Sequence, residues 1–134
     1  MPVSKVNAAI CSMVLVIVSL PACTSLGLLQ TTEERVERRA QARLDALMSQ
    51  KMEKVFTFVS PAVRETTTWQ RYGAGYAGVV NWREAKVISV NCEPERCEVK
   101  TAIRYQMFRQ KFENTRSFTE VWIKVGTQWY IYGD

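Results

Sequence analysis

Histidine is absent from this 134-residue chain, and aspartate occurs only at Asp45 and Asp134. Histidine is the commonest general acid–base group and activates many serine and cysteine nucleophiles, so its absence excludes most catalytic arrangements that work near neutral pH. A zinc site, which takes about four ligands, is also left short of donors. We therefore expect no metal, no cofactor and no enzymatic activity.

Long acidic or basic runs are also missing, and the net charge is only +5. This small excess fits solvated lysines and arginines as well as contact with anionic lipid or phosphate groups. Because no segment gathers aromatic and arginine residues as a nucleic-acid module does, we expect no nucleic-acid partner. The composition, 47% apolar and 10% aromatic, is typical of one packed domain.

The first 22 residues have the three parts of a secretory signal in order. Lys5 and the amino terminus supply positive charge, and residues 6–20 are mostly apolar. Leu20-Pro21-Ala22-Cys23 follows and resembles the lipobox of bacterial lipoproteins. That resemblance implies cleavage before Cys23 and attachment of a diacylglycerol to its thiol.

In that family an aspartate after the cysteine indicates retention in the inner membrane, and this chain has Thr24 there. The resemblance therefore implies a lipid anchor in the outer membrane, with the protein facing the periplasm. We expect a signal peptide at 1–22, a lipidated tether at 23–31 and one domain at 32–134. The alternative is an uncleaved anchor over residues 6–29, which is long enough to span a bilayer.

Cys92 and Cys97 are the thiols left free after cleavage and lipidation, because Cys11 lies in the signal peptide. Four residues, "EPER", separate them between two strand-like segments. A hairpin would bring the two thiols within disulfide geometry, and an oxidising periplasm would keep the bond formed. We expect a Cys92–Cys97 disulfide.

The first half of the domain has helical periodicity. Thr31 and Glu34 form a capping-box pattern, and Ser60-Pro61 predicts the start of a later short helix. The apolar positions of the first helix recur at helical spacing, whereas its charged residues, Arg43 among them, fall elsewhere on the wheel. The apolar positions are Val36, Ala40, Leu44, Leu47 and Met48.

From Trp82 onward the apolar period is two, which predicts strands at 82–92, 97–108, 117–125 and 128–134. In the first strand we expect Ile88 and Val90 on one face and Val87 on the other. In the second, Val99, Ile103, Tyr105 and Met107 share a face. In the third, Val121, Ile123 and Val125 oppose Phe118, Glu120, Trp122 and Lys124. The pattern predicts an α+β fold, with N-terminal helices packed on a curved antiparallel sheet of about four strands.

The order of these elements, with "VSPAVRE" between the helices and a final "QWYIYGD" strand, resembles the nuclear transport factor 2-like superfamily, which includes ketosteroid isomerase. The resemblance covers roughly residues 33–132. It implies a conical pocket between helices and sheet and an outer sheet face that often pairs two subunits.

Three functions are compatible with this sequence. The first is an interaction or assembly module that docks on itself or on an envelope protein, with Phe108, Phe118 and Trp122 at the interface. The second is a binding module for a small apolar or amphipathic ligand; its pocket residues would be Trp69, Tyr72, Tyr76, Tyr105 and Val121, although these side chains could simply fill the core. The third is an isomerase or dehydratase, for which Glu120 is the one acid within a strand that could face a pocket. We favour the interaction module.

Overall fold

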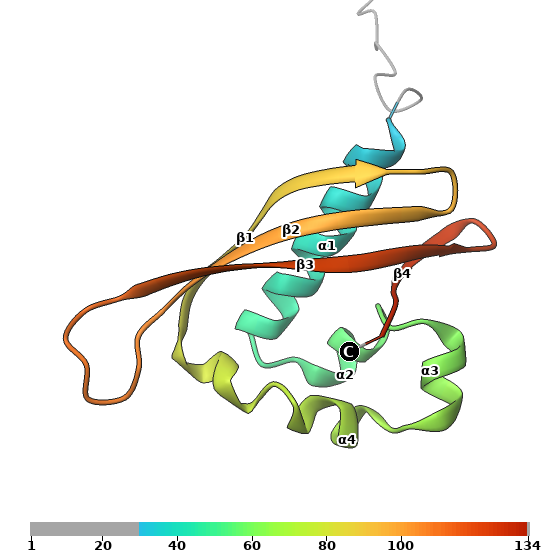
Figure 1. Cartoon of the computed structure of the whole chain (residues 1–134). Helices are drawn as coiled ribbons and strands as arrows, with labels where there is room; N and C mark the ends of the chain where they lie inside the picture. The colour runs from blue at the N-terminus through green and yellow to red at the C-terminus, as the bar shows by residue number, and fades with distance from the viewer. Residues whose placement is uncertain (1–29, 134) are drawn as a thin grey trace, which may run out of the picture.

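The computed structural model describes residues 30–133. Helices come first and strands follow, so that a curled four-stranded antiparallel sheet carries helices on one face (Figure 1). The helices are α1 (Thr32–Met48), α2 (Met52–Phe56), α3 (Pro61–Thr66) and α4 (Trp69–Ala74), followed by the 3₁₀ turn η2 (Ala77–Asn81). The strands, in sheet order, are β1 (Trp82–Cys92), β2 (Arg96–Tyr105), β3 (Asn114–Val125) and β4 (Gln128–Ile131). The α+β prediction is confirmed.

The capping box at the start of α1 is formed as the sequence predicts. The Thr31 hydroxyl accepts from the backbone N–H of Glu34 at 3.2 Å, and the Glu34 carboxylate accepts from the Thr31 N–H at 3.2 Å. These two bonds satisfy N–H groups that a helix start leaves unpaired. They fix where α1 begins.

Helix α1 packs on one face of the sheet and also forms hydrogen bonds with the edge strand β1. The Gln41 side chain accepts from the Val87 N–H at 3.0 Å and donates to the Ala85 carbonyl at 3.1 Å. One amide thus pairs two backbone groups of the edge strand β1, which would otherwise be open to another chain. This contact ties α1 to β1 beyond the burial of apolar side chains.

The core consists of two apolar clusters, one toward each end of the sheet. The cluster at the β1–β2 turn joins α1 and the region after α2 to β2, β3 and β4; it contains Val36, Ala40, Phe58, Val59, Cys97, Val99, Trp122, Trp129 and Ile131. The cluster at the other end contains Leu44, Ala46, Leu47, Val55, Val79, Ala85 and Ile103. Burial of a large aliphatic side chain contributes roughly 1.5–3 kcal/mol, so α1 is held mainly by this apolar face.

The predicted face of β1 is wrong at Ile88. Val87 pairs with Thr101 and Ser89 with Lys100, which leaves Ile88 as an extra residue in the strand. Such a bulge interrupts the alternation of side chains. Val87 and Val90 both pack against the core, and Ile88 is exposed.

The orientation of β3 is opposite to the one implied by the assignment of Phe118 and Trp122 to an interface. Cross-strand partners share a face, and Cys97 pairs with Trp122, Val99 with Glu120 and Thr101 with Phe118. Because Cys97, Val99 and Thr101 are buried, the Phe118–Glu120–Trp122 set faces inward as well. The sequence grouped these residues correctly, but alternation alone does not say which group faces the core. Met107, expected to share a face with Val99 and Ile103, lies beyond the end of β2 and is exposed.

Candidate functional site

Arg43 is the centre of a buried polar cluster between α1, α4 and the sheet. Only 1% of its side chain is exposed, although the sequence placed it on the charged side of α1. Its Nη1 donates to Glu120 Oε1 at 2.7 Å. Its Nη2 donates to the hydroxyl of Tyr76 at 2.7 Å and to that of Tyr72 at 3.2 Å. The two hydroxyls are 3.0 Å apart, so four side chains form one network.

This network keeps Arg43 charged inside the protein. Burial acts to lower the pKa of the guanidinium, but the Glu120 carboxylate and the two tyrosine hydroxyls outweigh burial, and the pKa is raised above its ordinary value. The guanidinium carbon also lies 5.4 Å from the centre of the Tyr76 ring, within cation–π range. A buried charge is tolerated only with such partners.

A cavity of about 290 Å³ lies against this network. Arg43, Tyr76 and Glu120 supply its polar wall, and Phe118 and Val121 are among its other lining residues. The volume is at the lower limit for small-molecule sites, which run from roughly 300 to 1,000 Å³. The acid that the sequence offered as a possible base, Glu120, is held in an ion pair with a permanently charged partner.

The five predicted pocket residues do not form one pocket. Tyr76 and Val121 line the 290 Å³ cavity. Tyr72 bonds to Arg43 but lines a separate cavity of about 240 Å³. Trp69 is 39% exposed beside α2, and Tyr105 packs against the second apolar cluster.

The three predicted interface residues also have different positions. Trp122 is fully buried, because its register opposite Cys97 turns it into the core, so its assignment to an interface is wrong. Phe118 is half-buried, packs against the second apolar cluster and lines the 290 Å³ cavity, so it faces the interior and not an outer surface. Phe108 is 82% exposed and remains available to a partner.

Phe108 belongs to the loop that joins β2 and β3, residues 106–113, hereafter the β2–β3 loop. Met107 and Phe112 in the same loop are exposed by 51% and 62%. The strand predicted at 97–108 placed Met107 inside the sheet, and the sequence analysis assigned no role to Phe112. The signal that could have found them is the composition of "MFRQKF", which has three large apolar residues in a connection between strands.

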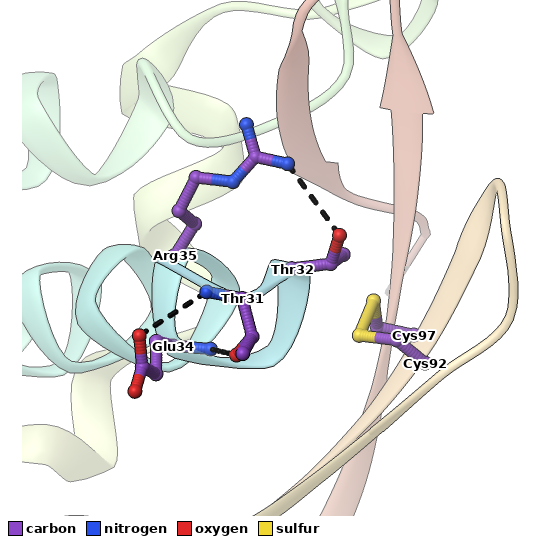
Figure 2. Close-up of a disulfide and its surroundings, with 6 residues drawn as sticks. All are labelled: Thr31, Thr32, Glu34, Arg35, Cys92 and Cys97. Carbon is purple, nitrogen blue, oxygen red and sulfur yellow. Dashed lines mark hydrogen bonds between the residues drawn. A yellow bond between two sulfur atoms is a disulfide. The ribbon is translucent and has the colours of Figure 1, made fainter. Parts of the chain in front are cut away.

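The predicted disulfide is present at the opposite end of the sheet. Cys92 and Cys97 face each other across the β1–β2 turn with their Cα atoms 4.1 Å apart, and their sulfur atoms are bonded. Figure 2 shows the bond near the start of α1, beside Thr31 and Thr32. Cys97 is fully buried and Cys92 packs against the first apolar cluster, so the bond fastens the turn to the core.

Other predicted features lie outside the described residues, namely the signal peptide, Cys23, most of the tether and the alternative anchor at 6–29. Within residues 30–133 no helix is long and apolar enough to cross a membrane. The same residues contain no group of three or more side chains suited to hold a metal ion.

Comparison with known proteins leaves the family open. No protein-family model matches the chain, and no curated protein matches it significantly. Among solved structures it is similar to the solution structure of a SEC-C motif containing protein from Rhodopseudomonas palustris, with 14% sequence identity and a TM-score of 0.56. The match covers 70% of this chain and 72% of that protein. At this identity the similarity shows a shared fold alone.

Proposed function

We propose that the protein is a lipoprotein of the bacterial cell envelope, attached through Cys23, and that its folded domain acts as a non-enzymatic interaction module. The lipid would hold it in the outer membrane, facing the periplasm. The observation that carries the interaction role is the β2–β3 loop, on which Met107, Phe108 and Phe112 are exposed together. Large apolar side chains gathered on a surface are typical of a contact with a partner.

The disulfide supports the envelope location. Disulfides persist in oxidising compartments and are rare where thiols are kept reduced. Cys92 and Cys97 are bonded, and they are the cysteines that remain after the proposed cleavage and lipidation at Cys23. The lipobox and the disulfide therefore both favour a location in the envelope, outside the inner membrane.

Glu120 is engaged in the buried network. A general base must lie within hydrogen-bond reach of the substrate proton that it takes. Glu120 instead accepts a 2.7 Å hydrogen bond from a guanidinium whose pKa is raised. We attribute a structural role to this pair, which joins α1 to β3.

A second candidate is binding of a small apolar or amphipathic ligand, as the resemblance to the nuclear transport factor 2-like superfamily implies. The observation in its favour is the 290 Å³ cavity beside Tyr76 and Val121. Native mass spectrometry of the protein purified from envelopes tests it. A ligand that copurifies, and that is lost when Val121→Trp fills the cavity, would establish this function.

The proposed function is tested in two steps. Mass spectrometry of the protein from bacterial envelopes should find an amino terminus at Cys23 carrying acyl chains, and an intact Met1 sequence would refute lipidation. A photoreactive amino acid at position 108 should then crosslink in those envelopes, whereas one at the exposed position 88 should not. Equal crosslinking at both positions would refute the assignment of the β2–β3 loop as the interaction surface.

A further inference from the structure

We propose that the β2–β3 loop docks on an anionic phospholipid bilayer, with Phe108 and Phe112 at the boundary between headgroups and acyl chains. This inference names the partner of the interaction module and rests on the envelope location proposed above. Three features of the loop support it: the exposure of its apolar side chains, the hydrogen bonds of its amide side chains, and its positive charges.

The apolar side chains point outward. Phe108 is 82% exposed, Phe112 62% and Met107 51%, within six consecutive residues. The β2–β3 loop extends beyond the helices at the end of the sheet opposite the β1–β2 turn (Figure 1). A projecting tip with large apolar side chains can enter a soft lipid surface, whereas a protein partner would need a matching hollow.

The two amide side chains of the loop, those of Gln106 and Gln110, are half-buried. Gln106 donates to the Gln110 carbonyl at 2.8 Å, and its own amide oxygen accepts from Arg83 at 3.0 Å. The Gln110 N–H donates to the Met107 carbonyl at 3.0 Å. These bonds give the loop a defined shape in which amides support the backbone while aromatic rings face solvent.

The residues between Phe108 and Phe112 carry positive charge only. Arg109 and Lys111 alternate with the aromatic residues, and no acidic residue occurs between Glu98 and Glu113. Glu113 itself is ion-paired with Arg104. The Arg109 guanidinium carbon lies 5.4 Å from the centre of the Phe108 ring. Cations beside aromatic rings match a surface of anionic headgroups over acyl chains.

The position of α1 indicates how the domain would be oriented on the membrane. The described chain begins at the start of α1, near the disulfide, while the β2–β3 loop is at the far end of the sheet (Figures 1 and 2). A domain attached at one end and docked at the other lies along the membrane. Both attachments then act on one bilayer, which raises the local concentration of the loop at the lipid surface.

The test places a reporter at the tip of the loop. The full chain with Phe108→Trp is reconstituted into vesicles of phosphatidylethanolamine and phosphatidylglycerol, with brominated lipid as a quencher of tryptophan emission. The unsubstituted protein, with its four tryptophans, supplies the background. We expect loss of the added emission at position 108. The matched control is Ile88→Trp, at a position that is 56% exposed on β1, and it should keep its emission.

The contribution of Arg109 and Lys111 to lipid binding is tested by a change of lipid composition and by the double variant Arg109→Gln/Lys111→Gln. Each cation near an anionic surface contributes a factor of about five in partitioning, so replacement of phosphatidylglycerol by phosphatidylcholine should weaken the contact by about 25-fold for two cations. The double variant should lose this dependence on composition.

Quenching that is absent at position 108, or equal at positions 88 and 108, would overturn the proposal. So would quenching that appears only after envelope proteins are added to the vesicles, because the partner would then be a protein. None of these results bears on cleavage at Cys23, which the mass of the amino terminus decides separately.

Discussion

The interior around Arg43 and the β2–β3 loop both reverse the usual distribution of polar and apolar residues. The Arg43 side chain is 1% exposed, whereas Phe108 at the loop tip is 82% exposed. The buried charge is surrounded by partners, namely Glu120 and two tyrosine hydroxyls. The exposed ring lies 5.4 Å from the guanidinium carbon of Arg109.

We infer from this difference that the network around Arg43 contributes to stability and the β2–β3 loop to function. Removal of a partner from Arg43 would leave a charge in the interior, at a high cost to the folded state. Removal of the Phe108 ring takes almost nothing from the fold, because the ring is already in solvent. The two regions should therefore respond in opposite ways to substitution, with the interior changing folding and the loop changing binding.

The largest effect is expected for Glu120→Leu. Loss of the carboxylate leaves Arg43 buried without its anionic partner, which should lower the free energy of unfolding by about 3–5 kcal/mol. Urea denaturation of the purified protein measures this loss. The double variant Arg43→Met/Glu120→Leu should recover most of it, because it removes both charges.

The control for this prediction is Glu113→Gln. Glu113 pairs with Arg104 on the surface, where both side chains are well exposed to water. Exposed pairs contribute little, so the midpoint of denaturation should hardly move. A Glu120 variant as stable as the Glu113 variant would contradict a structural role for the buried pair.

Reduction of the disulfide should have the next largest effect. The Cys92–Cys97 bond closes a short loop, which contributes about 2 kcal/mol on the chain-entropy model. Denaturation with and without reductant measures the difference, and Cys92→Ser/Cys97→Ser should match the reduced protein. If reductant has no effect on the midpoint, the bond does not stabilise this end of the sheet.

A smaller effect is expected for Gln41→Ala, which removes two hydrogen bonds to the edge of β1. The loss should be about 1–2 kcal/mol. Hydrogen exchange is the sharper measurement, since the Val87 amide should exchange faster while amides in the centre of β2 are unchanged. Uniform acceleration across the sheet would mean that Gln41 supports the whole fold and not this edge.

The smallest effect on stability is expected for Phe108→Ser/Phe112→Ser. Exposed substitutions usually change the free energy of unfolding by less than about 0.5 kcal/mol. The same variant should lose the contact of the β2–β3 loop with lipid. The matched control Ile88→Ser/Val125→Ser removes two exposed apolar side chains elsewhere and should keep that contact.

Local patterns in the sequence predicted much of the fold. The capping box at Thr31, the period of two from Trp82 onward and the spacing of Cys92 and Cys97 depend on neighbouring residues alone, and the structure confirms each of them. The class of fold followed from the order of these elements.

The features that the sequence did not predict depend on distant parts of the chain. The inward direction of Trp122 follows from the register of β3 against β2, and the exposure of Ile88 from a bulge in β1. Arg43 is buried because Glu120 and Tyr76, 77 and 33 positions away, meet it there. The predicted pocket and interface were wrong for the same reason. A residue of a strand can be assigned to a core, a pocket or an interface only when it is known which face of the strand packs against the helices.

Limited trypsin digestion of envelope membranes, opened so that trypsin reaches their periplasmic face, tests most directly whether the β2–β3 loop is the functional surface. Trypsin cleaves after Arg109 and Lys111, both exposed in the loop. The account predicts that these two bonds resist cleavage in the opened membranes and are cut after solubilisation in detergent, and that Phe108→Ser/Phe112→Ser is cut in both. Rapid cleavage of the unsubstituted loop in the opened membranes would contradict it.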